Sequence, residues 1–159
     1  MKKILALALS AVMVIGSLTA CNSGSTTTTT TTTVTAPAED VAMQYMTPAD
    51  AATHIGEEGY VFFDVRKAAD HTTAHIPGAL SYDMDAAKNG DFEAGVKVME
   101  TAIQNLDANI IVICYSGKSY AQATTNVLSA LGYDMSKVYT LDGGFNAWSE
   151  TYPDNVTTE

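Results

Sequence analysis

The chain from about residue 41 onward alternates between two hydrophobic patterns. Short runs rich in β-branched and aromatic residues, at 60–65, 109–114 and 137–141, predict buried strands. Segments in which apolar residues recur three or four positions apart predict helices at 92–106 and 120–131. Shorter helices are expected at 47–55, 67–73 and 145–151. Strands that alternate with helices predict an α/β fold, with a mostly parallel sheet and helices on both of its faces.

Cap and turn residues mark the ends of these elements. Thr47 followed by Pro48 is typical of a helix start, and Gly132 is placed to end the helix at 120–131. The turn at 75–79 contains Pro77 and Gly78. A pair of glycines at 143 and 144 separates the last strand from the last helix.

The N-terminus has the pattern of an export signal. Lys2 and Lys3 precede an apolar run at 4–15, and no charged residue follows before Cys21. We therefore expect residues 1–20 to be a signal peptide, with a buried N-terminal helix as the alternative. The segment Leu18-Thr19-Ala20-Cys21 resembles the bacterial lipobox. That resemblance implies a lipidated Cys21, which would anchor the chain to a membrane on the extracytoplasmic side of the bacterial cell envelope.

A threonine-rich segment follows Cys21. It contains eight consecutive threonines at 26–33 and lacks an apolar stripe, so it is not expected to fold by itself. We interpret residues 21–40 as the lipidated cysteine and a tether, and residues 41–159 as one folded domain. We expect that domain to be a monomer.

Composition narrows the classes of function. The chain has 159 residues and a formal net charge of −10, which argues against nucleic acid as a partner because phosphate binding needs clustered Lys and Arg. Loss of Lys2 and Lys3 with the signal peptide would leave six basic and eighteen acidic residues, a charge of −12. The acids Asp83, Asp85, Asp91 and Glu93 are expected to form a solvated face.

Two cysteines allow neither a disulfide-rich scaffold nor a four-cysteine zinc site. His71 and His75 are four residues apart, but no third ligand motif follows. We therefore expect no metal site and no cofactor, and we expect His75 to order its own turn.

Cys114 has the placement of a nucleophile. It ends the most apolar strand of the chain, and residues 115–119 lead directly into a helix. Ligands of α/β sheets bind beyond the carboxyl ends of the strands, and a helix N-terminus with a glycine-containing loop offers amides to an anion. The same surroundings stabilise a thiolate, and Lys118 adds a positive charge. The alternative is a buried, inert cysteine, although an unpaired thiol in an exported protein suggests reactivity.

Three motifs in this order resemble the rhodanese family. Asp64-Val65-Arg66 with the turn 75–79 resembles the first signature of the family, and 141–148 resembles its C-terminal signature. Cys114 and its loop occupy the place of the active-site loop between them. The resemblance spans about residues 45–152 and implies a five-stranded parallel sheet flanked by helices. Asp64 and Arg66 are interpreted as structural, through an ion pair or hydrogen bonds near the sheet.

The resemblance also implies sulfurtransferase chemistry. Cys114 would take the sulfane sulfur of a small anionic donor such as thiosulfate, hold it as a persulfide, and pass it to cyanide or an acceptor thiol. The implied donor-binding residues are those of the loop: Tyr115, Ser116, Gly117, Lys118, Ser119 and Tyr120. The chain departs from the family at two loop positions. Ser119 stands where many members have Arg, and Tyr120 stands where Ser or Thr is frequent, so thiosulfate is expected to bind poorly.

Two other functions compete with this interpretation. Phosphatases that share the fold have Cys-x5-Arg, but the sixth residue after Cys114 is Tyr120. A non-catalytic module, either a thiol redox sensor or a protein-binding domain in the envelope, is the second alternative. Formation of thiocyanate from thiosulfate and cyanide separates these hypotheses.

Overall fold

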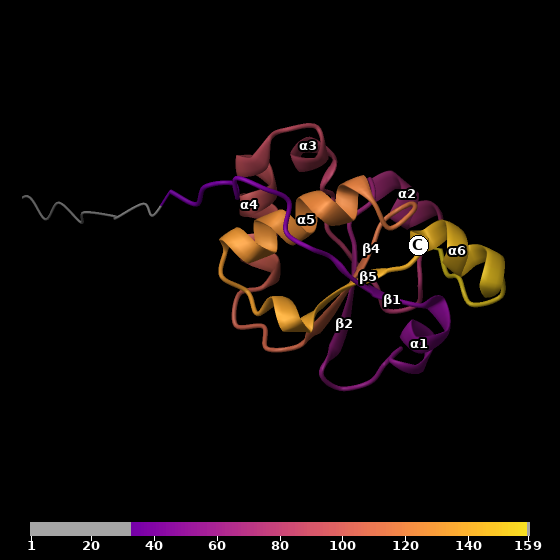
Figure 1. Ribbon diagram of the computed structural model, residues 1–159. Coiled ribbons are helices and arrows are strands. Elements are labelled where there is room, and N and C mark those ends of the chain that lie inside the picture. Colours follow the sequence, from indigo (N-terminus) through magenta and orange to yellow (C-terminus); the bar gives the residue numbers. More distant parts are fainter. Residues whose placement is uncertain (1–32, 159) are drawn as a thin grey trace, which may run out of the picture. The chain divides into compact units, whose positions relative to one another are not determined.

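The computed structural model describes residues 33–158 (Figure 1). Its sheet has five parallel strands in the order β1-β5-β4-β2-β3. The strands are β1 (Gln44–Met46), β2 (Tyr60–Asp64), β3 (Leu80–Ser81), β4 (Asn109–Ile113) and β5 (Val138–Leu141). This arrangement confirms the α/β fold and the five-stranded parallel sheet.

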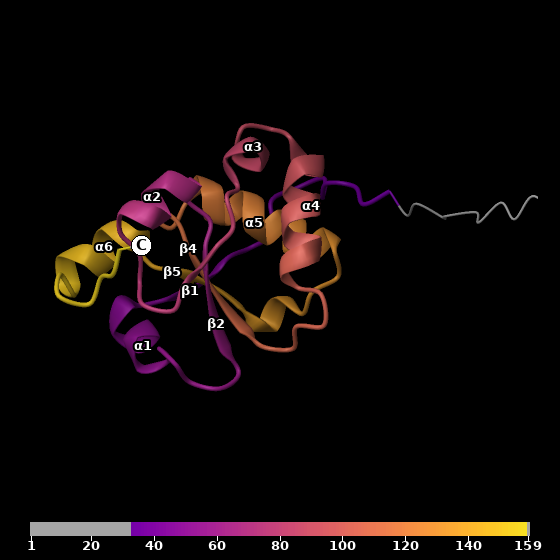
Figure 2. The same cartoon turned by 180° about the vertical axis from the view of Figure 1, so that it is seen from behind.

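Six α-helices cover the sheet in the described part of the chain. They are α1 (Pro48–Thr53), α2 (Ala68–Thr73), α3 (Asp85–Lys88), α4 (Phe92–Ala102), α5 (Ser119–Ala130) and α6 (Gly144–Thr151). Figures 1 and 2 show α3, α4 and α5 on one side of the sheet and α1 and α6 on the other. A 3₁₀ turn, η1 (Met135–Lys137), precedes β5.

The central strand β4 divides the core in two. Ile110, Val112 and Cys114 belong to the hydrophobic cluster beneath α4 and α5. Ile111 and Ile113 belong to the opposite cluster, together with the fully buried Trp148 of α6. Since side chains of a strand alternate between its faces, Cys114 is directed to the side of the sheet that carries α3, α4 and α5.

The long periodic elements lie where the sequence predicts them. The runs at 60–65, 109–114 and 137–141 form β2, β4 and β5, and the predicted helices form as well. The helix predicted at 92–106 ends earlier, at Ala102, because a turn follows in which Asn105 adopts a φ of 59°. Sequence analysis missed β1, β3 and α3, which have three, two and four residues.

Contacts of the folded part begin before residue 41. Val34 and Met43 pack against the cluster beneath α5, and Asp40 and Val41 bond to that helix. The predicted signal peptide and Cys21 lie outside the described residues. Within residues 33–158, no helix is long and apolar enough to cross a membrane.

Candidate active site

Cys114 lies directly beyond β4, at the carboxyl end of the sheet, and only 1% of the residue is exposed. The carbonyl oxygen of Cys114 accepts a hydrogen bond from Phe145 N at 2.7 Å, and that of Tyr115 accepts one from Asn146 N at 3.1 Å. Both donors belong to the first turn of α6, where backbone N–H groups have no partner within the helix. The carbonyls that open the loop are therefore turned toward α6.

The backbone amides of residues 115–120 differ from these hydrogen-bonded carbonyls. In the described part of the chain, none of the backbone N–H groups of residues 115–120 donates to another residue. They surround the point where β4 ends and the 12-residue helix α5 begins. Consecutive free amides at a helix N-terminus form a site suited to an anion.

Three glycines let the loop pack closely. Gly144 has a φ of 61°, and a Cβ there would lie 2.3 Å from Cys114 O and 2.7 Å from Ser116 N. Gly117 has a φ of 67°, and its Cβ would lie 2.7 Å from Leu141 O. Gly143 precedes α6 in the same left-handed conformation. No other residue type fits the contact between Gly144 and the Cys114 loop.

Two tyrosines of the loop are held by carboxylates. The Tyr115 hydroxyl donates to Asp70, and the Tyr120 hydroxyl donates to Asp85 Oδ1 at 2.5 Å. Their rings meet edge to face with centroids 5.2 Å apart. Burial and the hydrogen bond to Asp70 raise the pKa of Tyr115, and burial and the bond to Asp85 raise the pKa of Tyr120. Both hydroxyls therefore stay protonated as donors at neutral pH.

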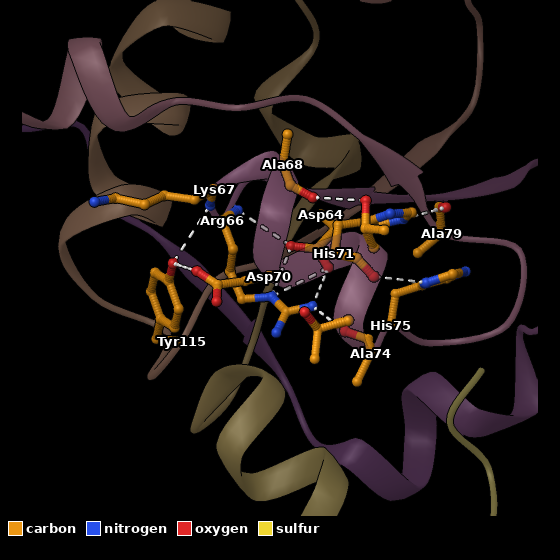
Figure 3. Close-up of polar contacts among 12 residues, drawn as sticks. Asp64, Arg66, Lys67, Ala68, Asp70, His71, Ala74, His75, Ala79 and Tyr115 are labelled. Atoms are coloured by element: carbon orange, nitrogen blue, oxygen red, sulfur yellow. Dashed lines mark hydrogen bonds and ion pairs between the residues drawn. The ribbon is translucent and has the colours of Figure 1, made fainter. Parts of the chain in front are cut away.

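The predicted ion pair of Asp64 and Arg66 is confirmed. Arg66 Nε lies 2.9 Å from Asp64 Oδ1 and Arg66 Nη2 lies 2.6 Å from Asp64 Oδ2, with both residues buried (Figure 3). Arg66 also donates to Ala74 O, and its guanidinium lies 3.8 Å from the Phe145 ring centroid. The pair joins the end of β2 to the end of α2 and the start of α6. Its role is structural, since its charge is already neutralised.

Other loop residues are open to solvent. Ser116, Lys118 and Ser119 are exposed, whereas Gly117 is buried. Lys118 pairs with no carboxylate among residues 33–158, so its charge is available to a ligand. The structure thus brings all the predicted loop residues together around Cys114. Their role in binding a donor stays a prediction.

Several contacts of the loop could not be expected from the motifs. Asp85, predicted on a solvated face, instead anchors Tyr120, and Asp83 accepts hydrogen bonds from Ala68 N and Asp85 N. Asp91 caps α4. Asp83 and Asp91 are nevertheless exposed, as a solvated face requires, and only Asp85 is half-buried. The expectation is incomplete for Asp85, because a carboxylate that binds a distant tyrosine looks like any exposed acid in a sequence. Glu93 is exposed and pairs with Lys97, as a solvated acid would.

The two histidines form a stacked pair in place of a metal site. Their ring centroids are 3.9 Å apart, His71 Nε2 lies 3.0 Å from Ala79 O, and His75 Nδ1 lies 2.9 Å from His71 O (Figure 3). His75 also forms a backbone bridge with Thr157, so it fixes its turn as predicted. Within the described part, no three His, Cys, Asp or Glu side chains converge as metal ligands.

Comparisons with known proteins agree with this geometry. The family model described as Rhodanese-like domain matches residues 47–151. The chain is 35% identical over 109 residues to Thiosulfate sulfurtransferase GlpE of Pseudomonas savastanoi pv. phaseolicola, covering 69% of this chain and 91% of the relative. It is 34% identical to the protein of the same name in Pseudomonas fluorescens, covering 70% and 90%.

Solved structures share the fold. The BH2092 protein of Bacillus halodurans matches with a TM-score of 0.56 and 26% identity, over 72% of this chain and 77% of that one. The As-Sb reductase of Leishmania major matches with a TM-score of 0.58 over 74% and 87% of the two chains, but its 17% identity supports the fold alone. The chain belongs to the rhodanese family. Within that family it is a rhodanese-type sulfurtransferase.

Proposed function

We propose that this sulfurtransferase moves sulfur from thiosulfate, or a similar small anionic donor, to cyanide or a thiol through a persulfide on Cys114. The Cys114 thiolate attacks the sulfane sulfur, the sulfur–sulfur bond of thiosulfate breaks, and sulfite leaves. The acceptor then attacks the outer sulfur of the persulfide. That bond breaks in turn, which forms thiocyanate or an acceptor persulfide and restores the thiolate.

The observation that carries this proposal is the set of free amides in residues 115–120 around a cysteine at the carboxyl end of β4. These amides can hold a thiosulfate anion, and afterwards they can stabilise the charge of the persulfide. Lys118 and the hydroxyls of Ser116 and Ser119 are the exposed groups able to add contacts to the donor. The curated relatives carry the name thiosulfate sulfurtransferase, which supports the same donor.

The burial of Cys114 does not separate this function from the alternative of a redox sensor. Cys114 is 1% exposed, so an oxidant and a sulfur donor alike reach the sulfur only if the loop shifts. Gly117, with its positive φ, lies at the middle of that loop. The names of the curated relatives favour the sulfurtransferase.

The test is sulfur transfer by the purified full chain. We expect thiocyanate to form from thiosulfate and cyanide, and we expect the peptide containing Cys114 to gain one sulfur atom after thiosulfate alone. Cys114→Ser should abolish both signals and keep the circular dichroism spectrum of the wild type. Thiocyanate formed by Cys114→Ser, or none formed by the wild type, would contradict the proposal.

We further propose that Cys21 is lipidated and anchors the domain on the extracytoplasmic side of a bacterial membrane. The support is the sequence around it: two lysines, an apolar run, and Leu18-Thr19-Ala20-Cys21. Two or three acyl chains are sufficient for stable attachment. We expect Cys21→Ala to move the protein from the membrane fraction to the soluble fraction, and unchanged fractionation would refute the anchor.

A further inference from the structure

The sulfur of Cys114 is closed off from solvent, although sulfur transfer requires a reactant to reach it. Cys114 is 1% exposed and belongs to the same buried cluster as Met84, on the side of the sheet that carries α3, α4 and α5. Of the two loop tyrosines, Tyr120 packs against this cluster, whereas Tyr115 is turned toward Asp70 of α2. Tyr120 is therefore the loop tyrosine that lies on the cysteine's side of the sheet.

Tyr120 is held in place by α3. Its hydroxyl donates to Asp85 Oδ1 at 2.5 Å, and Lys88 Nζ lies 5.8 Å from the centroid of its ring. Both partners belong to α3, which Figures 1 and 2 show next to α5. Lys67 Nζ lies 3.8 Å from the other carboxylate oxygen, Asp85 Oδ2. A hydrogen bond to an ionised carboxylate is stronger than one between neutral groups, so Tyr120 is restrained more firmly than by ring packing alone.

The backbone is fixed at both ends of this contact. Asp83 Oδ1 accepts from Asp85 N at 2.9 Å, and Asn89 Nδ2 donates to Asp85 O at 2.8 Å, so the residue that supplies the acceptor is held on both sides. Tyr120 belongs to the first turn of α5, and its carbonyl oxygen accepts from Thr124 Oγ1 at 2.8 Å. The part of the contact that can rotate is the side chain of Tyr120. Breaking one hydrogen bond therefore releases the ring without unfolding either helix.

We propose that Tyr120 and Asp85 form a latch that controls access to Cys114. While the hydroxyl of Tyr120 is bound to Asp85, the sulfur is shielded, as in this structure. When the hydroxyl leaves Asp85, the ring rotates away and a reactant reaches the sulfur. The inference rests on the proposed function, because the donor and the acceptor both need this opening. It is particular to this chain, since Ser or Thr is frequent in the family at the position of Tyr120.

The test measures how fast iodoacetamide, a small neutral reagent, alkylates Cys114 in the purified full chain. The mass of the peptide that contains Cys114 separates this reaction from that of Cys21. We expect Tyr120→Phe to raise the alkylation rate about tenfold, because the ring is kept but its hydrogen bond to the carboxylate is lost. Tyr133→Phe is the matched control, since its hydroxyl donates to Ala108 O at 2.6 Å at the opposite end of β4. It should change the rate less than about twofold.

Two further variants identify the contact. Asp85→Ala removes the acceptor and should accelerate alkylation as Tyr120→Phe does. The double variant should be no more than about twofold faster than either single variant, since both changes break the same bond. Tyr115→Phe releases the other loop tyrosine from Asp70, and we expect a change of less than about threefold. Multiplicative effects of Tyr120→Phe and Asp85→Ala, or an equal acceleration in Tyr115→Phe, would refute the latch.

Urea distinguishes opening of the latch from unfolding of the whole chain. Local opening exposes little surface, so the alkylation rate of Tyr120→Phe should be nearly constant at low urea concentrations. A rate that rises with urea as steeply as the unfolding equilibrium would show that Cys114 is reached by global unfolding, and would refute the latch.

Sulfur transfer is measured separately, so the latch and the proposed function can fail independently. If the wild type makes thiocyanate and Tyr120→Phe is alkylated at the wild-type rate, the latch is refuted and the sulfurtransferase function stands. If the wild type transfers sulfur to no acceptor, cyanide included, but the variants are alkylated as expected, the proposed function fails and the latch stands.

Discussion

Tyr115 and Tyr120 show how single side chains position the loop. Each is half-buried, and each donates its hydroxyl to a carboxylate from another element, Asp70 of α2 or Asp85 of α3. Asp85 in turn lies near a cation, since Lys67 Nζ is 3.8 Å from Asp85 Oδ2. The loop, with its free amides, is thereby tied to two acids, and Lys67 partly offsets the charge of Asp85.

The contact between Tyr120 and Asp85 predicts a pH dependence. The Tyr120 hydrogen bond lowers the pKa of Asp85 from its ordinary value of 3.8. Because the pKa is lower in the folded state, the contact stabilises the fold above about pH 4, and that contribution is lost as the pH falls below it. We expect Tyr120→Phe to raise the pKa of Asp85 toward 3.8, measured by NMR titration of its carboxyl carbon.

Tyr115→Phe is the control for that measurement, because its hydroxyl contacts Asp70 and not Asp85. It should leave the Asp85 titration where it is in the wild type. An unchanged Asp85 midpoint in Tyr120→Phe would contradict the hydrogen bond.

The buried pair of Asp64 and Arg66 gives a prediction about stability. In Asp64→Asn the shape is kept, but the Arg66 guanidinium remains buried without its counter-charge. We expect a loss of about 3 kcal/mol in the free energy of unfolding, measured with denaturant. Lys97→Gln breaks an exposed pair with Glu93 and should change that free energy by less than about 0.5 kcal/mol. A similar loss of unfolding free energy in both variants would show that the buried pair stabilises the fold no more than the exposed pair does.

At the scale of helices and strands, the sequence is informative where an element is long and apolar. The five residues of β4 are almost all fully buried, and such a run reads as a strand without any knowledge of its neighbours. The three residues of β1 are mostly exposed, and they form a strand only because β5 lies beside them. The two-residue strand β3 depends on β2 in the same way. Tertiary pairing, which no local pattern contains, defines these edge strands.

The same distinction between local pattern and tertiary contact applies to the candidate site. Cys114 and its loop are contiguous, so their composition could be interpreted directly. Their partners Asp70, Asp85 and Gly144 lie 44, 29 and 30 positions from Cys114 along the printed sequence, and only the fold brings them to the loop. The sequence predicts Gly144 only as part of the break between the last strand and the last helix. Its second role, the close contact with Cys114 O, depends on how α6 meets β4.

That contact predicts a strong effect of Gly144→Ala. The added Cβ would lie 2.3 Å from Cys114 O, so the loop has to move, and the residue keeps an unfavourable φ of 61°. We expect kcat/KM for thiosulfate to fall at least about tenfold, since small displacements of reacting groups are costly. The value of kcat/KM is measured from the rates of sulfite release and thiocyanate formation.

Gly132→Ala provides the matched control. Gly132 also has a positive φ, 78°, but no atom lies within 4 Å of an added Cβ. It should cost about 1 kcal/mol of stability from the backbone alone and leave kcat/KM within twofold. If both alanine variants retained full activity, the close contact at Gly144 would not matter for the loop.

At the scale of the whole molecule, the charge distribution opposes an anionic donor. The chain has a formal charge of −10, yet the proposed donor thiosulfate is a dianion. Near the loop, Lys67 and Lys88 lie close to Asp85, whereas Lys118 pairs with no carboxylate in residues 33–158. The long-range field that the proposed donor thiosulfate would meet on approach is that of the acidic protein, and the loop amides and Lys118 are the groups proposed to hold it at close range.

The net negative charge of the protein predicts that the reaction with thiosulfate becomes faster as salt is added. Screening weakens the repulsion between the acidic protein and thiosulfate, so kcat/KM for thiosulfate should rise severalfold as ionic strength increases from about 0.01 to 0.15 M. The reaction of the persulfide with cyanide should change less, because the attacking cyanide ion carries one negative charge, whereas thiosulfate carries two. Stopped-flow measurement of each half-reaction in NaCl separates the two. A fall in kcat/KM for thiosulfate with salt would mean that Lys118 and its neighbours, rather than the net charge, govern the approach of the donor.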